Sequence, residues 1–214
     1  MRIITGTARG IQLDTLDGLT TRPTSDRVKE ALFSMIQFDI EGRNVLDLFG
    51  GSGQLALEAL SRGAAKATII DSSRDAIDVI IGNAKKTRLF DKCRISCSDY
   101  SLFAEHASSG EKYGIIFLDP PYASDYMARS LALIAKNGLL ADGGTVVCES
   151  EVPEEERAGK KKRRESKEES EIKANAEINE KLFGSNTELS AKYTLIKSSV
   201  YGRTRITLLT VCRD

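Results

Sequence analysis

A strand, a glycine-rich turn and a helix follow one another from Asn44 onward, and this order constrains the fold most. Asn44–Phe49 is apolar, Gly50–Gly53 supplies the turn, and Gln54–Leu60 is rich in good helix formers. Such an order begins a βαβ unit, whose strands pair in parallel. Strands are predicted at 44–49, 66–71, 92–97, 113–118 and 144–149, with helices between them that include about 73–88 and 124–136. We therefore predict an α/β fold with a mostly parallel, doubly wound sheet.

The N-terminal residues do not belong to this alternation. Short β signals around 2–4 and 11–13 predict a small β-hairpin. Thr24 or Ser25 can cap a helix that runs to about Phe38. The beginning of the chain is therefore predicted to be an extension made of a hairpin and a helix.

The end of the chain returns to strand-like sequence. The runs 193–197 and 205–211 flank a Tyr201-Gly202 turn and predict an antiparallel hairpin at the edge of the sheet. The predicted organisation is thus an N-terminal extension at 1–43 and a main domain at 44–214.

A charged segment at about 151–190 interrupts the main domain. It contains the basic run Lys160–Arg164, many glutamates and few aromatic residues. Such a composition buries too little apolar surface to offset the entropy lost on ordering. We predict an insertion that is partly helical or disordered and that has no apolar face wide enough to dock from about 154 to 186. The basic run is interpreted as a solvated patch, with RNA contact as the alternative.

The tetrapeptide Asp119-Pro120-Pro121-Tyr122 follows directly on the predicted buried strand at 113–118. Consecutive prolines have no N–H for a strand ladder, so the chain must leave the sheet here. It then presents a carboxylate, proline carbonyls and an aromatic ring. These groups suit a planar ligand with an amine, such as a nucleobase, held by its amine and its face. The alternative for Asp119 is a simple turn residue.

The glycine-rich turn is a second candidate ligand site. Glycines let the backbone approach a ligand closely and leave the amides at a helix N-terminus available. Asp71 ends the next predicted strand, where an acid commonly binds a ribose hydroxyl pair. Gly51–Ala56 also matches the dinucleotide pattern G-x-G-x-x-A, so a dehydrogenase is an alternative. Against it, Asp47 would repel a pyrophosphate, and no second feature points to hydride transfer.

Together, Asp47–Gly53 and Asp119–Tyr122 resemble the motifs of S-adenosylmethionine-dependent amino-methyltransferases. Arg2–Gly10 and Thr21–Glu30 narrow the resemblance to the bacterial family that methylates N2 of a guanine in 16S ribosomal RNA. The likeness covers most of the chain outside the charged segment. It implies a Rossmann-like class I methyltransferase fold, S-adenosyl-L-methionine as cofactor, and 16S ribosomal RNA as partner, either naked or within a small-subunit assembly particle.

The resemblance also implies roles for particular residues. Asp119, Pro120, Pro121 and Tyr122 are the expected catalytic group, with Tyr122 stacking on the base. Asp47 is expected at the amino-acid end of the cofactor. Asp99 is expected at the adenine amine, with a plain helix cap as the alternative. The full set of expected cofactor-binding residues is Asp47, Phe49, Gly50, Gly51, Ser52, Gly53, Asp71, Ser72, Ser98, Asp99 and Tyr100.

Charge narrows the kind of RNA contact that this chain can make. It has 31 basic and 31 acidic residues, for a formal net charge of zero, which argues against nonspecific coating of nucleic acid. Local patches matter more than the sum. The candidate RNA footprint lies in the N-terminal extension and consists of Arg2, Arg9, Arg22, Thr24 and Arg27, with Lys29 beside them.

The remaining composition predicts no metal centre and no membrane segment. The four cysteines include no C-x-x-C pair, and His106 is the single histidine, interpreted as a surface helix residue. We expect reduced thiols in a cytoplasmic protein. No apolar run reaches the ~18 residues that span a bilayer, and no leader precedes the first strand. We also expect a monomer.

Two functional alternatives stay open beside guanine-N2 methylation. One is an adenine-N6 or cytosine-N4 nucleic-acid methyltransferase. The other is a non-catalytic RNA-binding assembly factor that shares the fold but transfers no methyl group. A protein glutamine methyltransferase is disfavoured, because that class resembles Asn-Pro-Pro-Tyr rather than the Asp-Pro-Pro-Tyr of this chain.

Overall fold

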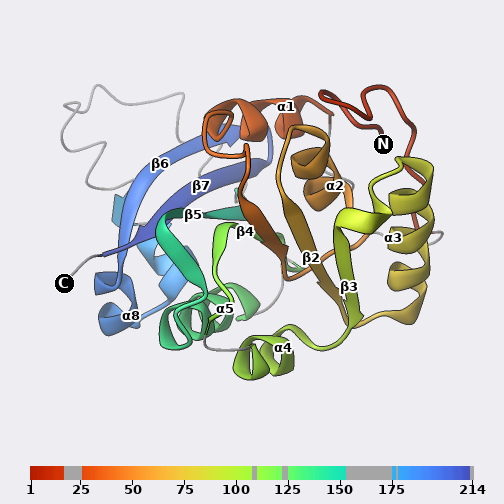
Figure 1. Ribbon diagram of the computed structural model, residues 1–214. Helices are drawn as coiled ribbons and strands as arrows, with labels where there is room; N and C mark the ends of the chain where they lie inside the picture. Colours follow the sequence, from red (N-terminus) through yellow and green to blue (C-terminus); the bar gives the residue numbers. More distant parts are fainter. Residues whose placement is uncertain (17–25, 108–109, 122–124, 153–174, 177, 213–214) are drawn as a thin grey trace.

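A single mixed sheet organises the protein. The computed structural model describes residues 1–16, 26–107, 110–121, 125–152, 175–176 and 178–212. Within them, seven strands lie in the order β3-β2-β1-β4-β5-β7-β6 (Figure 1). The strands are β1 Asn44–Asp47, β2 Lys66–Asp71, β3 Cys93–Cys97, β4 Tyr113–Leu118, β5 Leu140–Glu151, β6 Tyr193–Tyr201 and β7 Thr204–Val211. The first five pair in parallel and β7 runs antiparallel to β5 and β6, which confirms the predicted topology.

Several strand boundaries differ from the prediction, at β1, β5 and β6 by two residues or more. Strand β1 ends at Asp47 rather than at residue 49, because the backbone already turns toward the glycines there. Strand β5 begins at Leu140 rather than at 144. Its register against β4 shifts between the pairs Tyr113↔Leu140 and Ile115↔Thr145, so extra residues are absorbed as a bulge.

Helices cover both faces of the sheet, as the alternating order requires. Alternate residues of each central strand enter opposite cores: Phe117 belongs to one buried cluster and Leu118 to the other. One face is covered by α1 (Asp26–Met35), α2 (Gln54–Ser61) and α3 (Arg74–Lys86). The other is covered by α4 (Tyr100–His106), α5 (Tyr126–Lys136), a helical stretch at 178–183 and α8 (Thr187–Ala191) (Figure 1).

The N-terminal segment is held against α2 by hydrogen bonds to Glu58 and Ser61. Arg2 and Gln12 form an antiparallel bridge where the hairpin was predicted. Glu58 Oε2 then accepts the backbone N–H of Ile4 at 2.7 Å, and Glu58 Oε1 accepts that of Thr5 at 3.0 Å. The extension is thereby packed on the main domain rather than tethered to it.

The charged insertion is partly a core element, which corrects the sequence prediction. Ile178, Leu182 and Phe183 are each at most 3% exposed and lie in the core beneath α5, and Leu189 of α8 joins them. The Phe183 ring stacks on Tyr193 with centroids 5.7 Å apart. The prediction that nothing from about 154 to 186 docks was therefore wrong for this stretch. Three apolar side chains at helical spacing suffice to bury one face, even in a charged sequence.

Residues 153–174, which include Lys160–Arg164, lie outside the described part of the chain. In the part that is described, no helix is long and apolar enough to cross a membrane. The cysteines are free thiols, and His106 is an exposed residue at the end of α4.

Candidate active site

The carboxyl ends of the central parallel strands open into one large pocket. Its volume is about 1050 Å³, and its walls come from the turns after β1, β2 and β4, from α1, and from the hairpin between β6 and β7. Ligands of open α/β sheets bind at this edge, where the strand order reverses. The reversal here lies between β1 and β4, whose ends carry Asp47 and Asp119. The topology thus brings the two sequence motifs together.

The glycine turn forms the floor of the pocket. A Cβ on Gly50 would lie 2.6 Å from a methyl carbon of Ile69, so only glycine fits there. Gly51 and Gly53 have φ of +55° and +79°, a conformation that glycine adopts without strain. Gly53 then begins α2 without a side-chain cap. Gly50, Gly51 and Ser52 line the pocket, whereas Gly53 supports the turn from behind.

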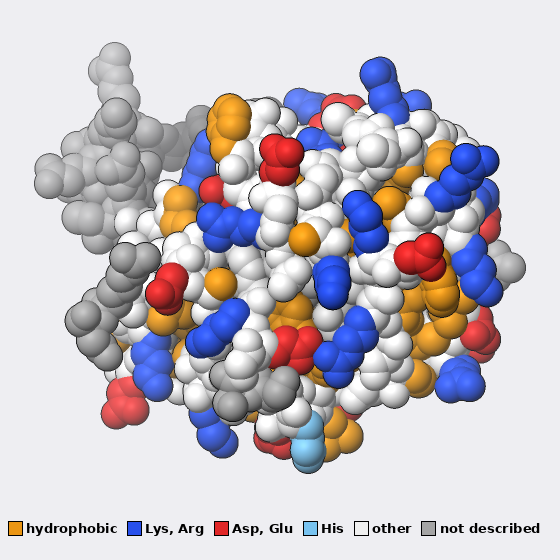
Figure 2. Space-filling view, in the orientation of Figure 1, with side chains coloured by type: hydrophobic (Ala, Val, Ile, Leu, Met, Phe, Trp, Pro, Cys, Tyr) orange, Lys and Arg blue, Asp and Glu red, His pale blue; other side chains and the backbone are white. Residues whose placement is uncertain are grey.

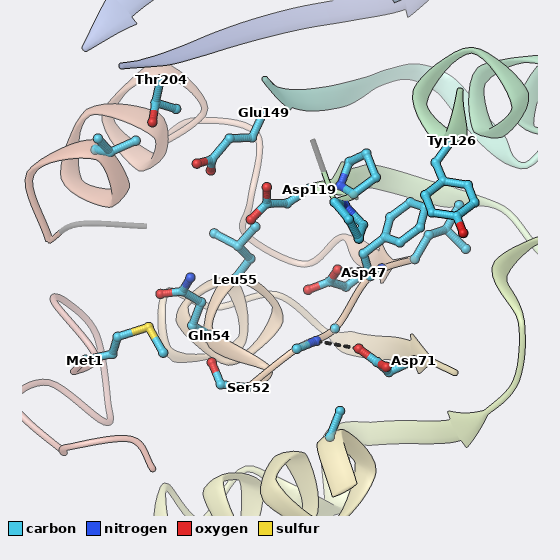
Figure 3. A pocket seen from close by; sticks show the side chains of 18 of the residues that line it. Met1, Asp47, Ser52, Gln54, Leu55, Asp71, Asp119, Tyr126, Glu149 and Thr204 are labelled. Carbon is cyan, nitrogen blue, oxygen red and sulfur yellow. Dashed lines mark hydrogen bonds between the residues drawn. The ribbon is translucent and has the colours of Figure 1, made fainter. Parts of the chain in front are cut away.

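Asp71 fastens the glycine turn to the end of β2. Its Oδ2 accepts the N–H of Gly51 and its Oδ1 accepts the N–H of Ser73, both at 2.8 Å (Figure 3). Asp71 and Ser72 line the pocket where a ribose was expected. A carboxylate has about four acceptor sites, so these two bonds leave capacity for ribose hydroxyls.

Asp47 is a buried carboxylate among like charges. It is 1% exposed, and its Oδ1 accepts the N–H of Phe49 at 3.3 Å. Burial raises the pKa of Asp47 to about 7; the backbone N–H of Phe49 opposes the shift, and the carboxylates of Asp119 and Asp71 add to it. A group that is costly to ionise here would be stabilised by a bound cation. The site therefore favours a positively charged ligand.

Asp119 lies beside Asp47 on the same pocket wall (Figure 3), and Pro120 also lines the pocket. Pro121 also lines the pocket, so the chain leaves β4 at the predicted point and directly into the cavity. Glu149, near the end of β5, joins this wall and is 3% exposed. Glu149 was not predicted from the sequence; its place at the end of a predicted central strand was the available signal. Tyr122 lies outside the described residues.

Three aromatic rings form the wall nearest to α4 and α5. The Phe49 ring lies 5.1 Å from Tyr100 and 6.0 Å from Tyr126, and the two tyrosine rings are 5.4 Å apart, between centroids. Phe49 and Tyr100 were predicted at the cofactor, whereas Tyr126 was not singled out. Such an apolar, aromatic surface suits the face of an adenine ring.

Asp99 has the capping role that was its alternative. Its Oδ1 accepts the N–H of Ser101 at 2.8 Å at the start of α4, and hydrogen bonding from Ser101 holds the pKa of Asp99 below its usual value. Asp99 also lines the pocket, so the cap does not exclude a ligand contact. Ser98 does not line it; its N–H donates to the carbonyl of Asp71 at 3.0 Å.

The residues of the candidate RNA footprint do not lie together in the structure. Arg27 lines the active-site pocket, and Arg203, which was not predicted from the sequence, reaches it from the β6–β7 hairpin. Arg2 and Arg9 line a separate, smaller pocket, and Arg2 pairs with Asp26 at 3.0 Å. Arg22 and Thr24 lie outside the described residues.

Lys29 is not a surface phosphate contact, so its place in the footprint was wrong. It is fully buried, its Nζ donates to the carbonyl of Arg2, and it lies 3.4 Å from Glu58 Oε2. Burial lowers the pKa of Lys29 while Glu58 opposes that shift. On the face shown in Figure 2, the described basic side chains are interspersed with acidic and hydrophobic ones rather than gathered into one patch.

The sequence matches that of known proteins along most of the chain. The family described as "Conserved hypothetical protein 95" matches residues 1–180. The chain is 38% identical over 152 residues to "Ribosomal RNA small subunit methyltransferase D" of Escherichia coli strain K12, which spans 71% of this chain and 75% of that protein. The Haemophilus influenzae protein of the same name is 32% identical over 152 residues, 71% of this chain and 79% of that one.

Solved structures agree with the sequence relatives. The Escherichia coli protein yhhF superposes with a TM-score of 0.73 at 31% identity, covering 99% of this chain and 97% of that one. A hypothetical protein of Thermus thermophilus superposes with a TM-score of 0.69 at 25% identity, covering 97% and 98%. The likeness therefore extends through the C-terminal hairpin as well as the motifs. Among the described residues, no group of acidic, histidine and cysteine side chains could hold a metal ion.

Proposed function

The chain belongs to the family described as conserved hypothetical protein 95 and is an S-adenosylmethionine-dependent methyltransferase, and from this premise we propose that it methylates the exocyclic N2 of a guanine in 16S ribosomal RNA. The observation that carries the proposal is the convergence of Asp119-Pro120 with Asp47 and the glycine turn in one pocket. A nucleobase amine and a cationic cofactor can thereby bind at neighbouring walls of the same pocket.

The pocket residues fit S-adenosylmethionine. The close packing at Gly50 keeps the turn free of side chains, so its backbone is open to the cofactor. Asp47 offers a desolvated carboxylate to the cationic amino-acid end, Asp71 offers acceptors to the ribose, and Phe49 and Tyr100 offer ring faces to the adenine. When bound, S-adenosylmethionine supplies an activated methyl group on a positively charged sulfonium.

Asp119 is proposed to act on the amine. The lone pair of guanine N2 is delocalised into the ring, so this amine is a weak nucleophile. A carboxylate that accepts one of its hydrogens, with the Pro120 carbonyl accepting the other, favours a pyramidal nitrogen. The same carboxylate stabilises the positive charge that develops on the nitrogen in the transition state. No covalent protein nucleophile is required, because positioning and electrostatics suffice.

The substrate is proposed from the relatives and from the shape of the site. Both relatives are named as methyltransferases of small-subunit ribosomal RNA. Asp119 lies inside a pocket rather than on an open face, so a target base must be splayed out of its stack to reach it. Arg27 and Arg203 at the pocket are placed to meet the phosphates that flank such a base.

The test is to identify the methylated nucleotide. The purified protein is incubated with labelled cofactor and 16S ribosomal RNA, either naked or in small subunits from cells that lack the gene. Nucleoside mass spectrometry is expected to find N2-methylguanosine at one position. N6-methyladenosine or N4-methylcytidine as the product would replace the guanine assignment. Absence of any product on both substrates, with the cofactor bound, would favour a non-catalytic assembly factor.

A further inference from the structure

Glu149 and Asp119 are neighbours on adjacent strands. The β4–β5 register pairs Leu118 with Cys148, so Asp119 and Glu149 come directly after a matched pair. Phe117 and Val147, two residues before them, lie together in the core beneath α1 and α2. Because side chains alternate along a strand, both carboxylates belong to that face. Figure 3 shows them extending into the same part of the pocket.

Glu149 is buried at the pocket end of an apolar row of side chains. Its side of the sheet continues as Val147, Ile206 and Leu208, which are all buried and apolar. The residue nevertheless lines the ligand cavity at 3% exposure. Its carboxylate is therefore placed where a ligand in the cavity can meet it.

A second buried polar group in the pocket indicates a polar ligand. Gln54, the first residue of α2, is 8% exposed and lines the same cavity. Its Oε1 has no hydrogen-bond partner among the described residues. An unsatisfied buried acceptor is costly unless a ligand supplies the donor. Figure 3 places Gln54 across the pocket from Glu149 and Asp119.

We propose that Glu149 selects guanine by accepting the hydrogen of its N1. This inference rests on the proposed guanine-N2 activity. In guanine, N1–H lies directly beside the N2 amine, so the two neighbouring carboxylates face two neighbouring donors. Asp119 accepts from N2 and Glu149 accepts from N1–H. A carboxylate has about four acceptor sites, so Glu149 can accept this hydrogen alongside its other contacts.

The same carboxylate excludes the other amino bases. Adenine and cytosine carry an unprotonated ring nitrogen beside their amine, and its lone pair repels Glu149. Specificity then comes from an attractive contact with guanine and a repulsive one with its competitors. A site built to hydrogen-bond a substrate N–H rejects analogues that lack it strongly, because a buried polar group is left unpaired.

The test compares guanine with 2-aminopurine at the target position. The analogue keeps the 2-amine but has an unprotonated N1. 16S RNA assembled from ligated fragments is presented naked and in reconstituted small subunits, and kcat/KM is measured for each base. The wild-type protein is expected to prefer guanine by on the order of 10²-fold, as for the loss of a hydrogen bond to a charged group. In Glu149→Gln the side chain can donate to the unprotonated N1, so the preference is expected to shrink about 10-fold or more.

Matched controls separate this role from a structural one. Asp142→Asn removes an exposed charge from the same strand and should keep the wild-type preference. S-adenosylhomocysteine affinity and thermal unfolding verify that Glu149→Gln is folded, and Glu149→Asp should keep the preference for guanine. If Glu149→Gln lowers kcat/KM equally for guanine and 2-aminopurine, the inference on Glu149 is overturned, whereas the proposed guanine-N2 function still stands. A wild-type protein that does not methylate guanine N2 overturns the proposed function itself.

Discussion

Two buried carboxylates, Glu58 and Asp47, lie in opposite surroundings. Glu58 is fully buried and accepts two backbone N–H groups and the Nε of Arg62 at 2.8 Å, with Lys29 at 3.4 Å. Asp47 is as deeply buried, but its charged neighbours are Asp119 and Asp71. None of the ion pairs in the described part of the chain involves Asp47.

The difference separates a charge that is paired within the protein from one that lines a ligand pocket. Glu58 is neutralised by the protein and joins the N-terminal segment, α1 and α2. Asp47 instead lines the pocket among other acids, and burial raises its pKa to about 7, with the carboxylates of Asp119 and Asp71 adding to the shift. A buried acid with its cations in place indicates assembly, whereas a buried acid among acids indicates a binding site.

Removing the structural charge should have the largest effect. Glu58→Ala leaves Lys29 buried beside no carboxylate and frees the N–H groups of Ile4 and Thr5. Breaking a buried ion pair in this way costs about 3–5 kcal/mol of unfolding free energy. Urea denaturation measures it, with the exposed Glu105→Ala as control. Glu58→Gln keeps the shape and should lose less. A loss of unfolding free energy below about 1 kcal/mol for Glu58→Ala would contradict the structural role given to Glu58.

Removing the proposed catalytic acceptor, Asp119, should affect turnover rather than stability. Asp119→Ala is expected to lower kcat by on the order of 10²-fold or more, since the contact with the amine strengthens in the transition state. S-adenosylhomocysteine affinity should change little, as measured by calorimetry. Asp142→Ala serves as the exposed control. Near wild-type turnover in Asp119→Ala would show that Asp119 is only a turn residue.

The ionisation of Asp47 should make the stability of the protein depend on pH. Its folded-state pKa of about 7 exceeds the unfolded value of about 3.9, so the folded protein binds this proton more tightly. The stability of the cofactor-free protein should therefore fall as the pH rises from about 4 to about 7, and this contribution should then level off.

The variant Asp47→Asn should remove that pH dependence. It should also weaken S-adenosylhomocysteine binding about 10-fold or more, because a charged hydrogen bond is lost. Denaturation at several pH values and calorimetry measure the two effects, with the exposed Asp78→Asn of α3 as control. An unchanged affinity of Asp47→Asn for S-adenosylhomocysteine would place the cationic end of the cofactor elsewhere. Tight binding of NAD without binding of S-adenosylhomocysteine would overturn the assignment of S-adenosylmethionine as cofactor.

The charged segment at 154–174 is expected to matter least. Replacing residues 154–174 with a short Gly/Ser linker is expected to change stability by no more than about 0.5 kcal/mol, since long surface insertions are tolerated. Cofactor affinity should stay the same. Extending the replacement to 186 removes Ile178, Leu182 and Phe183 and should destabilise by several kcal/mol, roughly as for Phe→Ala core changes. Equal losses of stability from the two replacements would contradict the finding that the stretch from Ile178 to Phe183 is part of the core.

Much of the site was predictable because its signals are local. Glycines that must adopt positive φ, prolines that must leave a sheet and acids at strand ends are each visible within a few residues. The residues that were missed, Tyr126, Glu149 and Arg203, lie on segments with no motif of their own. They reach the pocket because α5, β5 and the hairpin before β7 converge on the same end of the sheet.

Local sequence was sufficient for the order of strands and helices, the parallel sheet and the two motifs, because periodicity and turn chemistry act over short distances. Tertiary structure decided which charges are paired in the core and which line the pocket. Lys29 and Arg27 are two residues apart on α1, yet one is buried against Glu58 and the other lines the active-site pocket. That division depends on which distant element each side chain meets, since burial and neighbouring charge arise only when separate segments pack together.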